Sequence, residues 1–187
     1  MEILTRAELE YRKQEFIDKI KEGALFIYPT DTIYGIGCNA LKQRSVQKIR
    51  ELKGRQTSPL SIWVPSIDWI KRYCVISDKT EAWLQKLPGP YTLLLSLNKN
   101  HPLAKNVTAD QTIGVRLPKH WFQAIVEECG FPLITTSANK MGEPFMTSVE
   151  NLDHDLEQNV EFMIYEGEKD ARPSKIVDVE KEEVRER

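Results

Sequence analysis

The fold of this chain is decided by the stretch Ala24-Leu-Phe-Ile-Tyr-Pro-Thr-Asp-Thr-Ile-Tyr-Gly-Ile-Gly37. Residues 24–28 form a short apolar run that stops at Pro29, a pattern typical of a buried strand. Residues 30–37 are largely polar and contain two glycines, which predicts a loop where the strand ends. A buried strand that delivers a polar loop at its carboxyl end is typical of α/β proteins, which bind ligands at such loops.

Helices are predicted on both sides of this stretch. Thr5-x-x-Glu8 matches a capping box, and apolar residues then share one helical face until Gly23. Ser45 is placed to cap a second helix, which Gly54 ends. Further helices are predicted at Asp68–Tyr73, Glu81–Leu87, Trp121–Cys129 and in the segment Thr147-x-x-Glu150, with a turn at Pro88-Gly-Pro90.

Strands alternate with these helices along the chain. They are predicted at Leu60–Val64, Tyr91–Leu97, Thr112–Leu117, Leu133–Thr136, Glu161–Tyr165 and Lys175–Val179. Because neither a repeat nor a low-complexity linker interrupts the alternation, residues 1–187 are predicted to form a single α/β domain. Its sheet is expected to be twisted and mixed, with helices flanking it.

Composition excludes several classes of protein. The chain is 41% hydrophobic, enough for a folded core, yet no apolar stretch approaches the roughly 20 residues that span a bilayer. The three cysteines, at 38, 74 and 129, include no Cys-x-x-Cys pair, and the three histidines have no metal-ligand spacing. These features predict no membrane contact, no metal site, no disulfide framework and a cytoplasmic location.

Charge is nearly balanced overall but is basic in one place. The formal net charge of −2 argues against a protein that coats nucleic acid through bulk electrostatics. A single acid, Glu51, stands among the cations Lys42, Arg44, Lys48, Arg50, Lys53 and Arg55. A non-catalytic module that binds structured RNA through this cluster is therefore an alternative function. Against it, the cluster lacks an aromatic stacking series and the chain lacks a high isoelectric point.

Four short polar segments stand at the ends of predicted strands and helices. They are Tyr28-Pro-Thr-Asp-Thr-Ile-Tyr-Gly35, Lys53-Gly-Arg55, Thr112-Ile-Gly-Val-Arg116 and Thr136-Ser-Ala-Asn139. Three of the four lie where an open α/β sheet binds ligands, so we expect all four to form one cleft. Hydroxyls, an amide and fixed cations dominate, without a His/Ser or His/Cys pair for covalent catalysis. This composition suits the binding and positioning of anions.

Structural roles compete with the functional interpretation of each segment. Lys53 and Arg55 could complement the dipole of the helix that ends between them, and Thr136–Asn139 could be a turn capped by its own hydroxyls. Arg116 lies opposite the apolar face of its strand, where a guanidinium needs either solvent or an anionic partner. Gly35-x-Gly37-x-x-Ala40 also fits a dinucleotide fingerprint, but no apolar-faced helix opens directly from the strand.

The order and spacing of these segments resemble the YrdC/Sua5 family of threonylcarbamoyl-AMP synthases. The resemblance is carried in order by residues 28–37, Lys53-x-Arg55 with Pro59-Leu60, Pro88-Gly-Pro90 before a Tyr-Thr-Leu strand, Thr112-x-Gly-x-Arg116-x-Pro118, Thr136-Ser-Ala-Asn139 and Ser174-x-Ile-Val-Asp178. It implies the YrdC-like fold, similar to that of RibB, in the short form that has only the catalytic domain.

The resemblance implies a nucleotidyltransferase. ATP, L-threonine and bicarbonate would give threonylcarbamoyl-AMP and pyrophosphate for the threonylcarbamoyladenosine modification of tRNA, with Mg²⁺ accompanying ATP. Downstream tRNA-modifying transfer proteins would accept the product, and weak contact with tRNA or double-stranded RNA is possible. Such a reaction requires the protein to align the two substrates and to neutralise the phosphate charge, rather than to supply a nucleophilic side chain.

Site residues follow from the same resemblance, motif by motif. Those implied for ATP are Lys53, Arg55, Thr112, Ser137, Asn139 and Arg185. Those implied for threonine are Thr32, Arg116, Thr136 and Ser174. The catalytic charges would be Lys53, Arg55 and Arg116. Arg116 would bind the threonine carboxylate, because a planar guanidinium suits the geometry of a carboxylate.

Three departures from the family pattern bear on the substrate. The gap from Arg55 to Pro59 is one residue shorter than expected, Trp63 stands where some members place a histidine, and Lys175 replaces a common threonine. These departures leave two alternatives. One is a different amino-acid substrate, and the other is membership of a sister branch of the same fold that binds a nucleotide.

Overall fold

The computed structural model describes residues 1–55, 58 and 60–186. Within these residues ten strands form one mixed sheet in the order β1-β8-β2-β3-β7-β4-β6-β5-β9-β10. The strands are β1 (Glu2–Leu4), β2 (Phe26–Pro29), β3 (Tyr34–Gly37), β4 (Ser61–Trp63), β5 (Tyr91–Ser96), β6 (Thr112–Arg116), β7 (Leu133–Ser137), β8 (Phe162–Ile164), β9 (Lys175–Asp178) and β10 (Glu183–Arg185). The predicted single α/β domain with a mixed sheet is confirmed.

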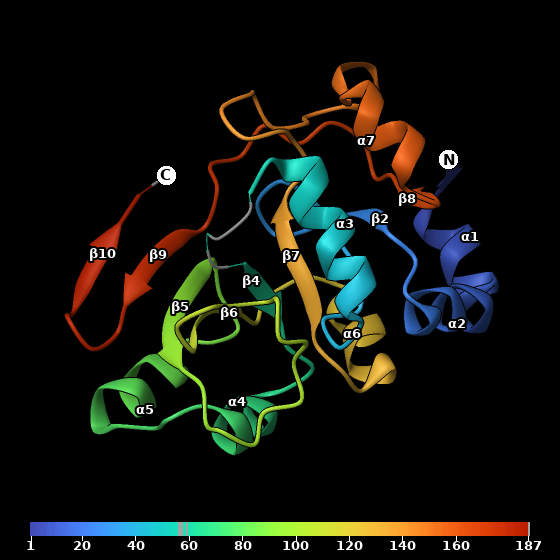
Figure 1. The fold of residues 1–187 in the computed structure, drawn as a ribbon. Helices are drawn as coiled ribbons and strands as arrows, with labels where there is room; N and C mark the ends of the chain where they lie inside the picture. The colour runs from blue at the N-terminus through green and yellow to red at the C-terminus, as the bar shows by residue number, and fades with distance from the viewer. Residues whose placement is uncertain (56–57, 59, 187) are drawn as a thin grey trace.

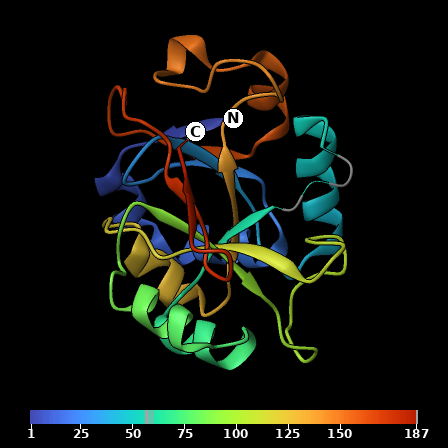
Figure 2. The ribbon, with the colours of Figure 1, turned by 90° about the vertical axis from the view of Figure 1, so that its left-hand side faces the viewer.

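Helices cover both faces of the sheet. They are α1 (Arg6–Tyr11), α2 (Lys13–Glu22), α3 (Gln43–Lys53), α4 (Ile67–Tyr73), α5 (Asp78–Leu84), α6 (Gln123–Cys129) and α7 (His154–Asn159), with a short 3₁₀ turn η1 (Val149–Asn151). Figure 1 shows α3 in front of the sheet, and Figure 2, turned by 90°, shows α3 and α6 on opposite sides of it. No helix in the described part of the chain is long and apolar enough to cross a membrane.

Two apolar clusters, one on each face, hold these layers together. The alternating side chains Ile113 and Val115 join Ile62 and Ile134 in the larger cluster, which α3 and α4 cover. On the other face Trp63 and the residues around it pack against α1, α2 and α6. Burial of this apolar surface is the main force that fixes the sheet, at roughly 25 cal/mol per Å².

The N-terminal prediction is partly wrong. The capping box is present, since Glu8 N donates to Thr5 Oγ1 while Thr5 N donates to Glu8 Oε2. The single helix predicted up to Gly23 is instead two, because Arg12 leaves helical geometry with φ −104° and ψ 23°. Gly23 does end α2, in the left-handed region at φ 110°.

Other boundaries also differ from the prediction. Ser45 lies inside α3 rather than at its cap, and its hydroxyl donates to Gly23 O at 2.7 Å. The helix predicted at 81–87 begins at Asp78, because Ser77 accepts a capping bond from Thr80 N. The helix predicted from residue 147 is only η1, followed by α7. Strands β1, β3 and β10 were not predicted from the sequence.

Candidate active site

The four polar segments predicted to share one region do come together. Gly35 pairs with Ser137 across β3 and β7, which joins the first segment to the fourth. Lys53 Nζ donates to Ser137 O at 2.6 Å, which brings the end of α3 to the same place. Arg116 Nη2 donates to Asp31 Oδ1 at 2.6 Å, which joins β6 to the loop between β2 and β3.

The site lies over a face of the sheet rather than beyond the strand ends. Ser61 pairs with Gly114 on one side and with Thr135 on the other, so all three project toward the same face. The expected position followed the rule that open α/β sheets bind ligands outside the carboxyl ends of their strands. Here β7 runs antiparallel to both β3 and β4, so strand beginnings and strand ends alternate around the site.

Two cavities make up the site. The inner pocket has a volume of about 20 Å³ and is lined by Thr30, Ile33, Tyr34, Gly35, Ser61, Thr92, Arg116, Thr135, Thr136, Ser137 and Ser174. The outer pocket has a volume of about 370 Å³ and is lined by Arg55, Ser58, Ser137, Met141, Phe145, Pro173 and Ile176. Ser137 lines both, so the two cavities adjoin at the end of β7. A larger hollow of about 490 Å³ beside α4 contains none of the predicted site residues.

Arg116 and Asp31 form a shielded ion pair at the inner pocket. Their side chains are only 8% and 10% exposed, so the anionic partner that the Arg116 position required is Asp31. Arg116 Nε and Asp31 Oδ2 are buried and have no hydrogen-bond partner among the described residues. Burial raises the pKa of Asp31, and the adjacent Arg116 guanidinium opposes that rise.

Hydroxyl groups cover the remainder of the inner pocket. Thr92 Oγ1 and Ser174 Oγ are 2.7 Å apart, which ties β5 to the segment before β9. Thr30 Oγ1 donates to Ile33 O and accepts from Thr32 N, so it shapes the loop after β2. Thr30, rather than the predicted Thr32, lines the pocket, although Thr32 Oγ1 lies 3.1 Å from Thr30 Oγ1. The predicted Thr136 and Ser174 line it too.

Lys53 and Arg55 differ sharply in their surroundings. Lys53 is 1% exposed, and its ammonium donates to Ser137 O, Asn139 O and Asn139 Oδ1. It therefore fixes the turn after β7, where Asn139 Nδ2 also donates to Glu143 O at 2.6 Å. Arg55 is half-buried and lines the outer pocket. Gly54, between them, ends α3 at φ 63°, as predicted.

The basic cluster of residues 42–55 is not a single charged surface. Arg50 is 4% exposed and donates to the carbonyl oxygens of Asn106 and Val107, at 2.7 and 3.0 Å. Burial lowers the pKa of Arg50. With Lys53 also buried, two of the six cations are structural ties within the fold. This weakens the RNA-binding alternative, which needs cations that face solvent.

Four of the six predicted nucleotide contacts line neither pocket: Lys53 and Asn139, which bond to each other beside Ser137, and Thr112 and Arg185, which lie elsewhere. Thr112 begins β6, where its amide donates to Asp110 Oδ1 and its carbonyl accepts from Thr108 Oγ1. Arg185 lies on the edge strand β10, where it is exposed and pairs with Glu183 at 2.6 Å. The structure does not bring Thr112 and Arg185 to the cavities described above.

The departures from the family pattern also lie outside the inner pocket. Trp63 is fully buried, and its indole donates to Gln123 Oε1 rather than lining the cavity. Lys175 is exposed and pairs with Glu186 at 3.0 Å. Neither side chain lines the pocket in which a substrate change was considered. Most of the shortened loop between Arg55 and Pro59 falls outside the described residues.

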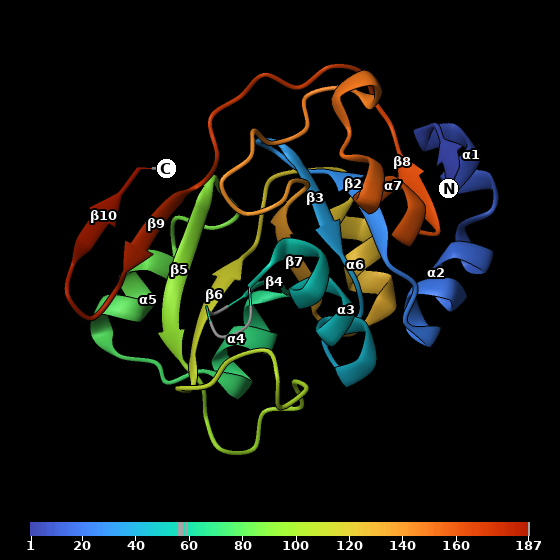
Figure 3. The same cartoon turned by 45° about the horizontal axis from the view of Figure 1, so that its top comes forward.

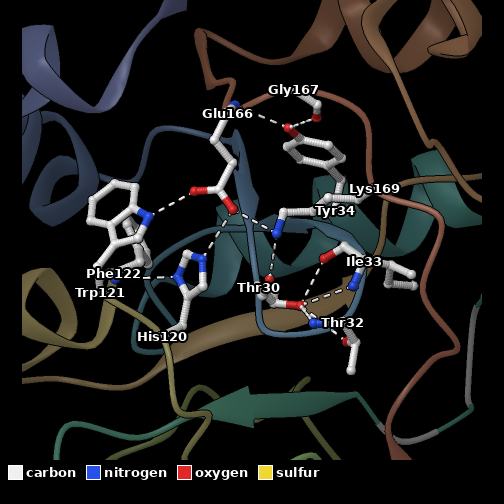
Figure 4. A network of polar contacts seen from close by, with 10 residues as sticks. All are labelled: Thr30, Thr32, Ile33, Tyr34, His120, Trp121, Phe122, Glu166, Gly167 and Lys169. Carbon is white, nitrogen blue, oxygen red and sulfur yellow. Dashed lines mark hydrogen bonds and ion pairs between the residues drawn. The ribbon is translucent and has the colours of Figure 1, made fainter.

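Glu166 is the centre of a polar network beside the site that the sequence did not reveal (Figure 4). Glu166 Oε1 lies 2.5 Å from Lys169 Nζ and 3.2 Å from His120 Nε2, while Glu166 Oε2 accepts from Trp121 Nε1 at 2.7 Å. Burial raises the pKa of Glu166, but the hydrogen bonds from Lys169, Trp121 and His120 outweigh this effect and lower it overall. No motif signals this network, because its members are brought together only by the fold.

Comparisons with known proteins agree with this architecture. The model of the Sua5/YciO/YrdC family, described as telomere recombination, matches residues 18–186. A putative threonylcarbamoyl-AMP synthase of Methanocaldococcus jannaschii is 34% identical over 94% of this chain and 82% of its own length. The threonylcarbamoyl-AMP synthase of Bacillus subtilis is 34% identical over 75% of this chain and 42% of its own.

A solved structure shares the fold over nearly the whole chain. The crystal structure of P. abyssi Sua5 complexed with L-threonine superposes with a TM-score of 0.81 at 30% sequence identity. The match covers 95% of this chain and 53% of that one. The chain therefore spans most of the M. jannaschii relative but about half of the B. subtilis and P. abyssi proteins.

Proposed function

Because this chain belongs to the Sua5/YciO/YrdC family, we propose that it is an L-threonylcarbamoyladenylate synthase. It would form threonylcarbamoyl-AMP and pyrophosphate from L-threonine, bicarbonate and ATP, for the threonylcarbamoyladenosine modification of tRNA. The observation that carries the proposal is the pair of cavities that adjoin at Ser137. An adenylating enzyme needs two ligands side by side, with the acyl group facing the α-phosphate.

The inner pocket suits the amino acid. Its lining combines one guanidinium with threonine and serine hydroxyls, which are partners for a carboxylate and for a hydroxyl side chain. Arg116 would hold the threonine carboxylate, using the Nε that has no partner in the described structure. Asp31 would keep its Oδ1 on Arg116 and offer Oδ2, which has no partner among the described residues, to the amino group. A hydroxyl-lined site of this kind selects threonine over valine, because the isostere leaves polar groups unpaired.

The outer pocket suits the nucleotide. Met141, Phe145 and Ile176 offer apolar surface to a base, while Arg55 and Ser137 offer a cation and a hydroxyl to phosphates. Lys53 supports this arrangement from behind, because it fixes the turn that carries Ser137 and Asn139. Lys53 would therefore maintain the shape of the phosphate site and make its electrostatic potential more positive.

Alignment and charge neutralisation carry the reaction. The amine of threonine and bicarbonate first give the carbamate, with loss of water. One carbamate oxygen then attacks the α-phosphorus, a new P–O bond forms, and the bond to the β-phosphate oxygen breaks so that pyrophosphate leaves. Arg55 would neutralise charge on the phosphates, and Arg116 would hold the acyl donor in line across Ser137.

Mg²⁺ would enter with the nucleotide. None of the outer-pocket side chains is a carboxylate, and the described residues hold no group of His, Cys, Asp or Glu that could bind a metal. This donor set fits an ion bound by triphosphate oxygens and water, as Mg²⁺ often is, with Ser137 within the same cavity. It does not fit an ion held by the protein alone.

The proposed setting is the cytoplasm, where transfer proteins would pass the product to tRNA. The three cysteines are free and buried, in agreement with a reducing compartment. Burial raises the pKa of Cys38. A regulatory thiolate at that position is therefore disfavoured.

The test is pyrophosphate release by the purified protein. With ATP and Mg²⁺ present, release should require both bicarbonate and L-threonine, and valine should replace threonine poorly. Mass spectrometry of the same mixture should show threonylcarbamoyl-AMP. Equal release without bicarbonate or amino acid would mean that the site hydrolyses ATP, and equal rates with valine would mean that the amino acid is a different one.

A further inference from the structure

The inner pocket is roofed in part by a segment without helix or strand. Residues 165–174, here called the strap, connect β8 to β9, which lie at opposite parts of the sheet. Figure 3 shows the strap passing over the top of the sheet between these two strands. Its last residue, Ser174, lines the inner pocket, and its neighbour Pro173 lines the outer one.

The strap is tied to the loop after β2 and to β3 by polar contacts, and at its start the Tyr165 ring stacks on Tyr34 with 5.8 Å between ring centroids. Lys169 Nζ donates to Thr30 O at 3.0 Å, and Tyr34 Oη donates to Gly167 O at 2.6 Å. The amide of Glu166 returns a bond to Tyr34 Oη at 3.0 Å. Thr30 and Tyr34 line the inner pocket, so the strap is fastened to one of its walls.

Glu166 holds this fastening in place. Its carboxylate is 24% exposed and meets two cationic or potentially cationic groups, Lys169 and His120, together with the Trp121 indole. Without it, the Lys169 ammonium at Thr30 O would lose its counter-charge in a half-buried position. Figure 4 shows the carboxylate between the strap and the His120–Trp121 turn, with Lys169 reaching from it to Thr30.

The pocket beneath is too small for an amino acid. A cavity of about 20 Å³ holds roughly one water molecule. One side is the floor of β4, β6 and β7, which are paired on both edges in the interior of the sheet and are costly to move. The opposite side is the loop at Thr30–Ile33, held by the contacts above, and the end of the strap, where the Ser174 hydroxyl lies 2.7 Å from that of Thr92. Enlargement of the pocket therefore requires these two segments to shift.

We propose that Glu166 is a positioning residue that latches the strap over the inner pocket, and that the strap lifts to admit the amino acid and closes over it. This inference rests on the proposed function only in naming L-threonine as the ligand. Glu166 touches no reacting atom in this arrangement. It acts through Lys169 and Thr30, which set the wall of the pocket.

Hydrogen exchange tests the latch without any need for turnover. The amides to follow lie in the peptide around 164–170, in wild type, Glu166→Gln and the control Glu168→Gln, an exposed strap residue two positions away. Loss of the charge should speed exchange there about tenfold or more in Glu166→Gln, while β6 and β7 exchange as before and Glu168→Gln behaves as wild type. L-threonine should slow exchange of the strap in wild type and should do so less in Glu166→Gln.

Two results would overturn the latch. One is a strap that exchanges at the wild-type rate in Glu166→Gln; the other is a wild-type strap that does not respond to L-threonine at a concentration at which calorimetric titration shows the amino acid bound. If Glu166→Gln loosens the whole protein, Lys169→Met removes the same tie from the other side and should give the local effect alone. Failure of the proposed reaction is read separately, since pyrophosphate release plays no part in this measurement.

Discussion

Arg116 Nη2 donates to Asp31 Oδ1 at 2.6 Å, and this contact joins two segments that are 85 residues apart in the chain. The pair leaves a donor on Arg116 and an acceptor on Asp31 without partners among the described residues. Burying such atoms costs free energy unless a ligand or a water molecule forms hydrogen bonds with them. The pair is therefore both a structural tie and the strongest candidate for recognition of a zwitterion.

Removal of Arg116 should both destabilise the fold and abolish activity, and the two effects can be separated. Arg116→Met leaves the Asp31 carboxylate buried without its cation, which should lower the free energy of unfolding by about 3–5 kcal/mol. Urea denaturation measures this change. The double variant Arg116→Met with Asp31→Asn should recover most of the lost stability but none of the pyrophosphate release. A single variant as stable as wild type would show that the pair is not shielded as described.

Lys53→Ala and Arg55→Ala should have different effects, although the two residues flank the same glycine. Lys53 is buried against the carbonyl oxygens of Ser137 and Asn139, so its removal should lower both the melting temperature and the activity. Arg55 lines the open pocket, so its removal should cost at least tenfold in ATP affinity with little change in stability. Calorimetry and ATP titration of both variants check this, and equal melting temperatures would contradict the assignment of Lys53.

Local patterns in the sequence predicted most of the sheet. The alternation of Ile113, Val115 and Leu117 identified β6, and glycines marked the ends of α2 and α3. Glycine has low strand propensity, so Gly35 and Gly37 predict a loop where the structure has strand β3. The structure gives the reason for Gly37, where a Cβ would lie 2.4 Å from Ile134 O and 2.7 Å from the Tyr28 ring; at Gly35 a Cβ would lie 3.3 Å from Thr136 O. That requirement comes from a neighbouring strand, so no local pattern can show it.

The candidate site was predictable only in part, for the same reason. Polar composition at the ends of predicted elements located the four segments, the resemblance assigned roles to their residues, and the fold brings the segments together. The partner of Arg116, the inward ties of Arg50 and Lys53, and the Glu166 network depend on contacts between distant segments. Charge alone could not separate a cation that faces solvent from one that holds carbonyl oxygens inside the fold.

Stability should fall in mild acid because of His120. Burial lowers the pKa of His120, and its hydrogen bond to Glu166 offsets this only partly. The folded-state pKa therefore lies below the unfolded value of about 6.5, so the unfolded chain binds the proton first as pH falls. The contribution of neutral His120 to the free energy of unfolding is complete above about pH 6.5. It is lost as pH falls from there toward the folded-state pKa.

A His120→Asn variant isolates this effect. Its free energy of unfolding should depend less on pH between about 7.5 and 5.5 than that of wild type, by at most about 1.4 kcal/mol per pH unit. Urea titrations at several pH values measure the two slopes. Glu166 has a lowered pKa and loses its contribution only at more acidic pH, outside this window. If the free energy of unfolding depends on pH equally in the two proteins, the His120 side chain is not shielded from solvent.

Gly114 should be required because any side chain at that position would fill the floor of the inner pocket. A Cβ there would lie 2.5 Å from Ser61 Oγ and 2.9 Å from Thr92 Cγ2, both from pocket-lining residues. Gly114→Ala should therefore weaken L-threonine binding about tenfold or more, while ATP binding in the outer pocket changes little. The triple variant with Ser61→Gly and Thr92→Ser removes the two clashing groups and keeps the Thr92 hydroxyl near Ser174. Calorimetric titration should show partial recovery of L-threonine affinity in that variant. Gly114→Ala with wild-type L-threonine affinity would mean that the amino acid binds elsewhere.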